Sequence, residues 1–206
     1  MAQAPYAMRA RREVGAYLRR TVVAIGGFIA LIWLVWLVNA VLFQGALHAF
    51  GIRPRATGGL IGLPLHPLLH GDLPHVIHNS IGIALFGTLV YLREERHFWI
   101  VTLLGTLLGG LGVWLFARPL IHIGASSVIF AYFGYLVSTG LFERRVGSLI
   151  LSIAVFLLWG SVLLGVLPLQ AGISWEGHLF GFLAGVVAAR ALARRRAPRT
   201  PRTAGG

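Results

Sequence analysis

The sequence predicts an all-α integral membrane protein that crosses the bilayer six times. Of its 206 residues, 57% are hydrophobic and only 12% are charged, which is about half the charged share of a typical soluble domain. A helical span needs about 20 apolar residues, and six runs along the chain meet this need. Arginine gathers at the ends of these runs. Together, these observations favour a bundle of helices in lipid over a soluble fold.

The six predicted spans extend from residue 21 to residue 192. We expect them at Thr21–Phe43, Val76–Leu92, Phe98–Phe116, Gly124–Leu141, Val146–Leu167 and His178–Leu192. The first apolar run is too long for a cleavable signal peptide, so we interpret it as a retained span. The second and sixth runs are short and carry polar residues. Such spans typically line a protein interior or a wet cavity.

Three further segments complete the predicted organisation. Residues 1–20 form a basic N-terminal segment, and residues 21–192 form the six-helix domain. Residues 193–206 form a basic tail, whose Pro, Gly and Arg content predicts disorder. The loop at 44–75 is long and unusually apolar for a solvated loop. We therefore expect it to lie in the membrane interface or to pack on the bundle.

The charge distribution predicts the topology. The formal net charge is +12 and the chain has no lysine, so arginine supplies every fixed positive charge. With both termini in the cytoplasm, all arginines except Arg53, Arg55 and Arg118 lie on the inner side, as the positive-inside rule requires. Arginine at span ends contacts lipid headgroups, so we predict the lipid bilayer and not nucleic acid as a partner. The absence of cysteine excludes disulfides and thiol chemistry.

Polar residues cluster at the predicted outer side, in "HPLLHGDLPHVIHNS", "GASSVIF" and "SWEGHLFGFLAG". If the fourth and sixth spans are neighbours, Ser126 Oγ and a ring nitrogen of His178 come within hydrogen-bond reach. This is the nucleophile–base geometry of acyl transfer. Ser126 begins a helix, where free backbone N–H groups can bind an oxyanion. His75 and Asn79 are four residues apart, so they share a helix face and could donate to the same oxygen.

Each of these residues also has a purely structural interpretation. Ser126 and Ser127 could cap the fourth span, and Asn79 could form a hydrogen bond between helices. His66 and His70 are spaced like metal ligands, but neither cysteine nor an HExxH pattern accompanies them. We therefore predict no metal site. Small residues at four-residue spacing predict close helix packing in the third and sixth spans; the pairs are Gly105 with Gly109 and Gly181 with Gly185.

The motifs and their order along the chain resemble those of the rhomboid family of intramembrane serine proteases, over roughly residues 20–192. The GxSG motif of the family corresponds to Gly124–Ser127, and its HxxxN motif corresponds to His75–Asn79. Its histidine at the sixth span corresponds to His178, which is followed by Gly181 and Gly185. The resemblance implies a rhomboid-like bundle of six transmembrane helices in the inner membrane of a bacterium.

The resemblance also implies roles for individual residues. Ser126 would be the nucleophile and His178 the general base of a Ser–His dyad that needs neither an acid nor a cofactor. The oxyanion would be bound by His75, Asn79 and the backbone N–H of Ser126. Supporting roles in holding water or in stacking on the catalytic imidazole fall to His66, His70 and Phe130. The implied substrates are proteins with a single transmembrane helix, cut near the outer membrane boundary. The oligomeric state is left open.

Two departures from the family pattern leave alternatives. Ser127 stands where the GxSG motif has its second glycine, and overpacking at a tight helix contact costs about 1–3 kcal/mol. The Trp-Arg dipeptide that some members carry in the first loop is absent. One alternative is therefore a catalytically inactive rhomboid-like protein that binds membrane helices. A second is a His-lined transporter, although polar residues on one side only disfavour it. We interpret Glu176 as a solvated loop charge.

Overall fold

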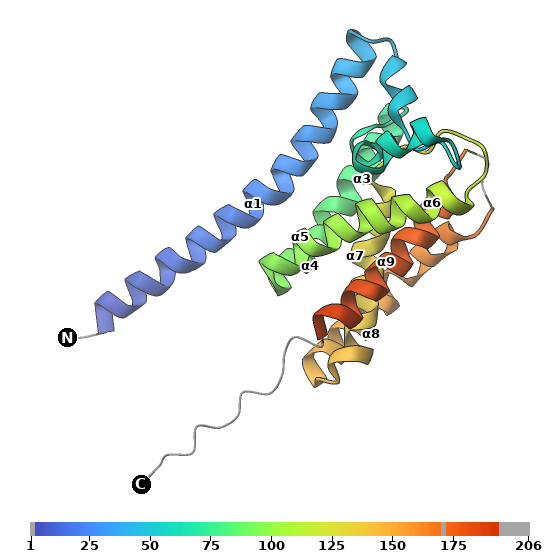
Figure 1. Ribbon diagram of the computed structural model, residues 1–206. Helices are drawn as coiled ribbons and strands as arrows, with labels where there is room; N and C mark the ends of the chain where they lie inside the picture. The colour runs from blue at the N-terminus through green and yellow to red at the C-terminus, as the bar shows by residue number, and fades with distance from the viewer. Residues whose placement is uncertain (1–2, 170–171, 194–206) are drawn as a thin grey trace.

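Helices dominate the part of the chain that the computed structural model describes, residues 3–169 and 172–193 (Figure 1). Lipid offers no partner for backbone N–H and C=O groups, so apolar runs in a membrane fold as helices that satisfy these groups internally. The elements are α1 (Gln3–Val41), η1 (Ala46–Phe50), η2 (Thr57–Ile61), α2 (Gly62–Leu65), η3 (His66–Leu68), α3 (Leu73–Gly82), η4 (Ile83–Gly87), α4 (Thr88–Arg93), α5 (Glu95–Leu104), η5 (Gly105–Gly109), α6 (Gly110–Phe116), α7 (Ser126–Glu143), α8 (Val146–Trp159), η6 (Gly160–Val166) and α9 (Trp175–Ala193). The chain is thus an all-α membrane bundle, as the sequence predicts.

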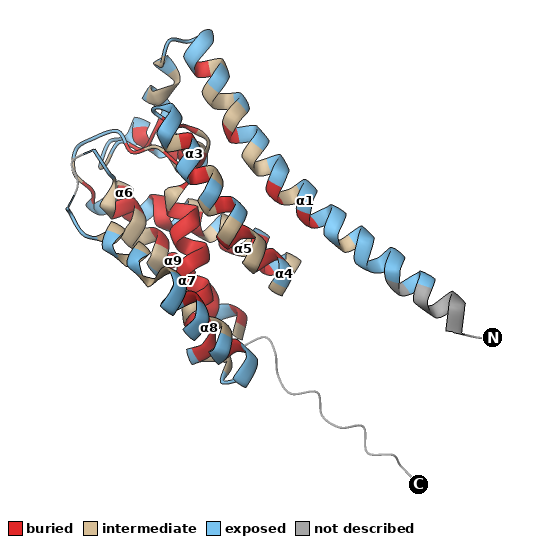
Figure 2. Ribbon diagram, turned by 180° about the vertical axis from the view of Figure 1, so that it is seen from behind, coloured by how far each residue is buried: buried red, intermediate tan, exposed pale blue. Residues whose placement is uncertain are grey.

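Five helical stretches in the described residues are long and apolar enough to cross a membrane: Arg11–Val41, Leu73–Arg93, Glu95–Phe116, Val146–Val166 and Trp175–Ala193. The second and third are continuous helices that pass through the single π-turns η4 and η5. The predicted fourth span corresponds to α7, which has 18 residues and is not among these five stretches. Figure 2 shows α7 as mostly buried within the bundle, where it faces other helices instead of lipid. Its Ser, Tyr and Thr side chains and its Gly residues therefore contact protein, and the free energy of transferring them into lipid does not arise.

The close approach of α7 and α9 organises the bundle. A Cβ added at Gly181 would collide with the carbonyl oxygen of Ser127, and one added at Gly185 would collide with that of Ala131. Glycine at these two positions lets the backbones of the two helices touch. The small-residue spacing therefore places the predicted fourth and sixth spans side by side.

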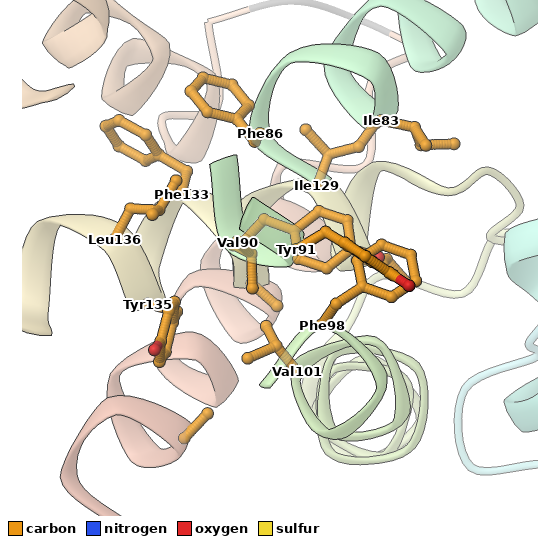
Figure 3. Close-up of a cluster of buried hydrophobic side chains, with 14 of the residues drawn as sticks. Ile83, Phe86, Val90, Tyr91, Phe98, Val101, Ile129, Phe133, Tyr135 and Leu136 are labelled. Carbon is orange, nitrogen blue, oxygen red and sulfur yellow. The ribbon is translucent and has the colours of Figure 1, made fainter. Parts of the chain in front are cut away.

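Aromatic and aliphatic side chains fill the space between α7 and the helices α4 and α5 (Figure 3). The Phe98 and Tyr132 rings stack with centroids 5.4 Å apart, and Phe86 meets Phe133 at the same distance. Ring pairs of this kind contribute about 0.5–1.5 kcal/mol beyond their burial. This core fixes α7 against α4 and α5.

The first loop packs on the bundle, which is one of the two placements that the sequence left open. Backbone hydrogen bonds between Ile52 and His122 join the loop to the segment before α7. A Cβ on Gly62 would collide with the backbone of Gly51 and Ile52, so the loop is folded tightly on itself.

The sequence predicts a basic segment at each end of the chain. The predicted basic segment and the first span belong to one continuous helix, because α1 runs unbroken from Gln3 to Val41. Of the predicted disordered tail at 193–206, residues 194–206 lie outside the described residues.

We expect Gly185→Val to destabilise the bundle by about 1–3 kcal/mol or more, because the new side chain must push α9 away from α7. The matched control is Gly147→Val in α8, where an added Cβ meets nothing within 4 Å. Thermal unfolding of the purified protein in detergent measures both. Equal melting temperatures for the two variants would contradict the close helix contact.

Candidate active site

Ser126 begins α7 and lies at the end of the bundle that the first loop covers. The preceding Gly124 has a φ of 113°, a conformation that side chains rarely adopt, and its N–H donates to the carbonyl of His66 at 2.8 Å. This turn presents the first residue of α7 to the loop region. Ser126 is half-buried, whereas Ser127 is buried. Backbone N–H groups in the first helical turn have no partner within the helix, so the N–H of Ser126 is available to a ligand.

His178 lies in the first turn of α9 and stacks on Phe130 of α7. The two ring centroids are 4.1 Å apart and the planes are 7° from parallel. Phe130 follows Ser126 by four residues, so both side chains project from one face of α7. The imidazole therefore lies over the face that carries Ser126. Within the described residues Ser126 Oγ and His178 form no direct hydrogen bond; such bonds often tighten only when substrate is bound.

A hydrogen bond to Gly165 fixes the proton on the His178 ring. Nδ1 lies 2.7 Å from the carbonyl oxygen of Gly165, in η6. A carbonyl oxygen can only accept, so Nδ1 carries the proton and Nε2 of the neutral ring keeps a free lone pair. This is the tautomer that a general base needs.

His75 and Asn79 lie beside the turn that precedes Ser126. A Cβ added at Gly124 would be 2.5 Å from His75 Nε2 and 3.7 Å from Asn79 Nδ2. The N–H of Gly71 points at His75 Nδ1 from 3.5 Å, which makes Nδ1 an acceptor and leaves the proton on Nε2. Asn79 uses one amide hydrogen on the carbonyl of His75 at 3.0 Å and keeps the other. Two side-chain donors therefore face the start of α7.

Ser127 forms a buried hydrogen bond with His66. The Ser127 hydroxyl lies 2.8 Å from His66 Nε2, and His66 Nδ1 is within 3.1 Å of the carbonyls of Gly62 and Leu63. Nδ1 must therefore donate to these carbonyls, and Nε2 accepts the hydroxyl proton of Ser127. Burial lowers the pKa of His66 to about 4, so the ring is neutral at pH 7. The hydroxyl that replaces the motif glycine is thus fully satisfied.

The other predicted supporting histidine is also buried near the site. The His70 ring meets that of His75 edge-on, with centroids 4.8 Å apart. Its Nε2 is buried and has no hydrogen-bond partner among the described residues. Burial, followed by the proximity of His75, lowers the pKa of His70 to about 4. An unpartnered buried nitrogen of this kind is suited to binding a water molecule.

A small cavity of about 10 Å³ lies next to Ser126 and Ser127. It has room for about one water molecule. His66, His122 and Ser174 also line it. His122 Nε2 donates to the carbonyl of Arg118 at 3.0 Å, and the Ser174 hydroxyl is 2.7 Å from His122 Nδ1. His122 was not among the predicted site residues, although it precedes Ser126 by only four positions.

The interpretation of Glu176 as a solvated loop charge is wrong. Glu176 lies in the first turn of α9 and its side chain is 2% exposed. It accepts from the guanidinium of Arg118 at 2.7 Å and from the backbone N–H of the same residue at 3.2 Å. The hydrogen bond to Glu176 raises the pKa of Arg118. The pair ties the start of α9 to the segment that leads into α7, instead of orienting His178.

The described residues contain no group of three His, Cys, Asp or Glu side chains that could hold a metal ion. The side chains around Ser126 are hydrogen-bond donors and acceptors on separate elements. Chemically, this arrangement offers a hydroxyl, a ring nitrogen with a free lone pair, and donors directed at one backbone turn.

Comparison with known proteins shows extensive similarity. A model of the Rhomboid domain family matches residues 57–195. An uncharacterized protein of Mycobacterium tuberculosis is 39% identical over 171 residues, which cover 79% of this chain and 71% of the relative. An uncharacterized protein of Mycobacterium leprae is 38% identical over 176 residues, covering 81% and 69%. The Bacillus subtilis protein named "Putative rhomboid protease YdcA" is 28% identical over 163 residues, covering 76% and 80%.

The buried histidines predict an acid-sensitive fold. His66 and His70 titrate near pH 4 when folded and at about 6.5 when unfolded, so the unfolded chain binds more protons between these values. The contribution of the two neutral histidines to the free energy of unfolding is therefore fully present above about pH 6.5, and it falls as the pH drops toward 4. The loss is on the order of 3 kcal/mol per histidine. We expect the melting temperature to fall across this range, and to fall less in the double variant His66→Gln, His70→Gln. An identical pH profile for both proteins would contradict this assignment.

Proposed function

Because the chain belongs to the rhomboid family, we propose that it is an intramembrane serine endopeptidase with Ser126 and His178 as its catalytic dyad. The observation that carries the proposal is the stack of His178 on Phe130, one helical turn from Ser126. The hydrogen bond from His178 Nδ1 to Gly165 supports it, because this bond leaves Nε2 free to take a proton.

In the proposed reaction, Ser126 Oγ attacks the scissile carbonyl carbon while His178 Nε2 takes the hydroxyl proton. The resulting imidazolium is stabilised by the carbonyl of Gly165, which already accepts from Nδ1. The imidazolium then gives its Nε2 proton to the leaving amine, and an ester on Ser126 remains. A water molecule, deprotonated by the same nitrogen, attacks the ester carbonyl and releases the carboxylic acid and the free serine.

The tetrahedral oxyanion would be bound by three donors. These are the backbone N–H of Ser126, the Nε2–H of His75 and the second amide hydrogen of Asn79. Their positions around the turn at Gly124 support this role. Removing one such donor typically lowers the rate about 10²–10³-fold.

Hydrolysis within a membrane also needs water. We assign this supply to the small cavity beside Ser126, together with the unpartnered Nε2 of His70. The proposed substrates are membrane-spanning helices, preferably single-span proteins, that unwind near the outer boundary of the membrane. Residues of low helix propensity lower the cost of unwinding. The N-terminal half of α1, which carries its arginines, and the last turn of α9, which carries Arg190, lie on the side opposite α3 (Figure 1), which supports cytoplasmic termini in a bacterial inner membrane.

The nucleophile is identified by labelling the purified protein with a fluorophosphonate, which reacts with activated serines. We expect an adduct on Ser126, and no adduct in Ser126→Ala or His178→Ala. Ser127→Gly is the matched control: it removes the donor to His66 and lowers stability by about 1–3 kcal/mol, yet retains labelling. Labelling that survives in Ser126→Ala and disappears in Ser127→Gly would transfer the role to Ser127.

The position of the His178 ring can be tested without touching the dyad. A Cβ added at Gly165 would lie 2.9 Å from Phe130 Cζ and 3.1 Å from His178 Nδ1. We expect Gly165→Ala to shift the ring and to slow fluorophosphonate labelling by about 10–10²-fold. Gly160→Ala, in the same η6 segment, meets only ordinary contacts at 3.6 Å and should label at the wild-type rate. Equal labelling rates for the two variants would show that the position of the His178 ring does not affect the reactivity of the serine.

A further inference from the structure

A cavity of about 620 Å³ separates part of the first helix from the bundle. α1 is fixed to the bundle at both sides of this cavity: the Tyr17 hydroxyl donates to the carbonyl of Tyr91 at 2.8 Å, and Trp33 Nε1 donates to Ser80 Oγ at 3.0 Å. Between these two contacts the cavity separates α1 from α4 and α5; Figures 1 and 2 show α1 at the edge of the bundle. We name the cavity the α1–α5 groove; its walls run along Arg19–Leu31 of α1 and Glu95–Thr102 of α5.

The groove is charged at one end and apolar along the rest. Arg19 and Arg20 lie at its N-terminal end, where Arg20 approaches Glu95 at 3.5 Å. Arg19 has no ion-pair partner among the described residues, so two arginines against one glutamate leave the lining with a net positive charge. Trp99, one turn after Glu95, is the kind of side chain that sits at a membrane interface. This pattern fits an amphiphile with an anionic head.

The length of the groove matches one leaflet of the bilayer. From Arg19 to Leu31 the helix rises about 18 Å, slightly more than half of the ~30 Å hydrocarbon core. The groove therefore spans one leaflet. A volume of about 620 Å³ is available between α1 and α5. A single acyl chain is slender enough to fit.

We propose that the α1–α5 groove binds an anionic phospholipid of the inner leaflet. Its phosphate contacts Arg19 and Arg20, and one acyl chain lies along Gly27, Leu31 and Trp99. Basic pockets between transmembrane helices on the cytoplasmic side are suited to anionic headgroups, and the arginine distribution predicts that this end is cytoplasmic. The proposal does not depend on peptidase activity, because the groove lies apart from Ser126.

Native mass spectrometry of the full chain, released from detergent with added phosphatidylglycerol or phosphatidylcholine, tests the proposal. Each arginine near an anionic lipid contributes about fivefold in affinity, so we expect phosphatidylglycerol to bind at least fivefold more tightly than phosphatidylcholine. This preference should disappear in the double variant Arg19→Gln, Arg20→Gln. It should persist in Arg11→Gln, Arg12→Gln, which removes the same charge from α1 outside the groove.

A second pair of variants tests the acyl chain. An added Cβ meets nothing within 4 Å at either Gly27 or Gly26, but only Gly27 lines the groove. Gly27→Phe should therefore fill the groove and reduce lipid retention at least fivefold, while Gly26→Phe should retain lipid as the wild type does. Inorganic phosphate should not displace the lipid. Equal binding of both lipids by the wild type, retention by Gly27→Phe, displacement by phosphate alone, or a dimer that Gly27→Phe abolishes would each overturn the proposal.

Discussion

The backbone contact between α7 and α9 is the constraint on which the rest of the structure depends. Gly181 and Gly185 allow the carbonyls of α7 to touch the facing helix, and this brings His178 onto Phe130. Any larger side chain at these positions would widen the gap and move the imidazole away from the face of Ser126. The geometry of the candidate site therefore rests on two residues that carry no functional group.

The sequence predicts those parts of the fold that depend on local pattern. Apolar runs predict the spans, and glycines at four-residue spacing predict which helices approach closely. Ser126 and His178 are predicted as site residues because each lies at the start of a span. The exceptional helix is α7, most of whose residues are buried among other helices instead of facing lipid.

The contacts that the sequence could not predict join segments that lie far apart along the chain. Arg118 and Glu176 are 58 residues apart, and His66 and Ser127 are 61 apart. Nothing in the local pattern around Glu176 distinguishes a buried ion pair from a solvated charge. The same holds for His122, whose partner Ser174 comes from a different loop. Such pairs become visible only when the fold has placed both segments.

The ring protons described for His75 and His178 have a consequence for the electrostatics of the candidate site. One ring keeps its proton on Nε2 and the other on Nδ1, and each choice is imposed by a backbone group: the Gly71 N–H in the first case and the Gly165 carbonyl in the second. One uncharged imidazole can therefore donate a proton from Nε2 in a hydrogen bond and the other can accept one there, without a carboxylate to orient either ring. In a medium of low dielectric constant, two neutral imidazoles avoid the Born energy of a buried charge that has no partner.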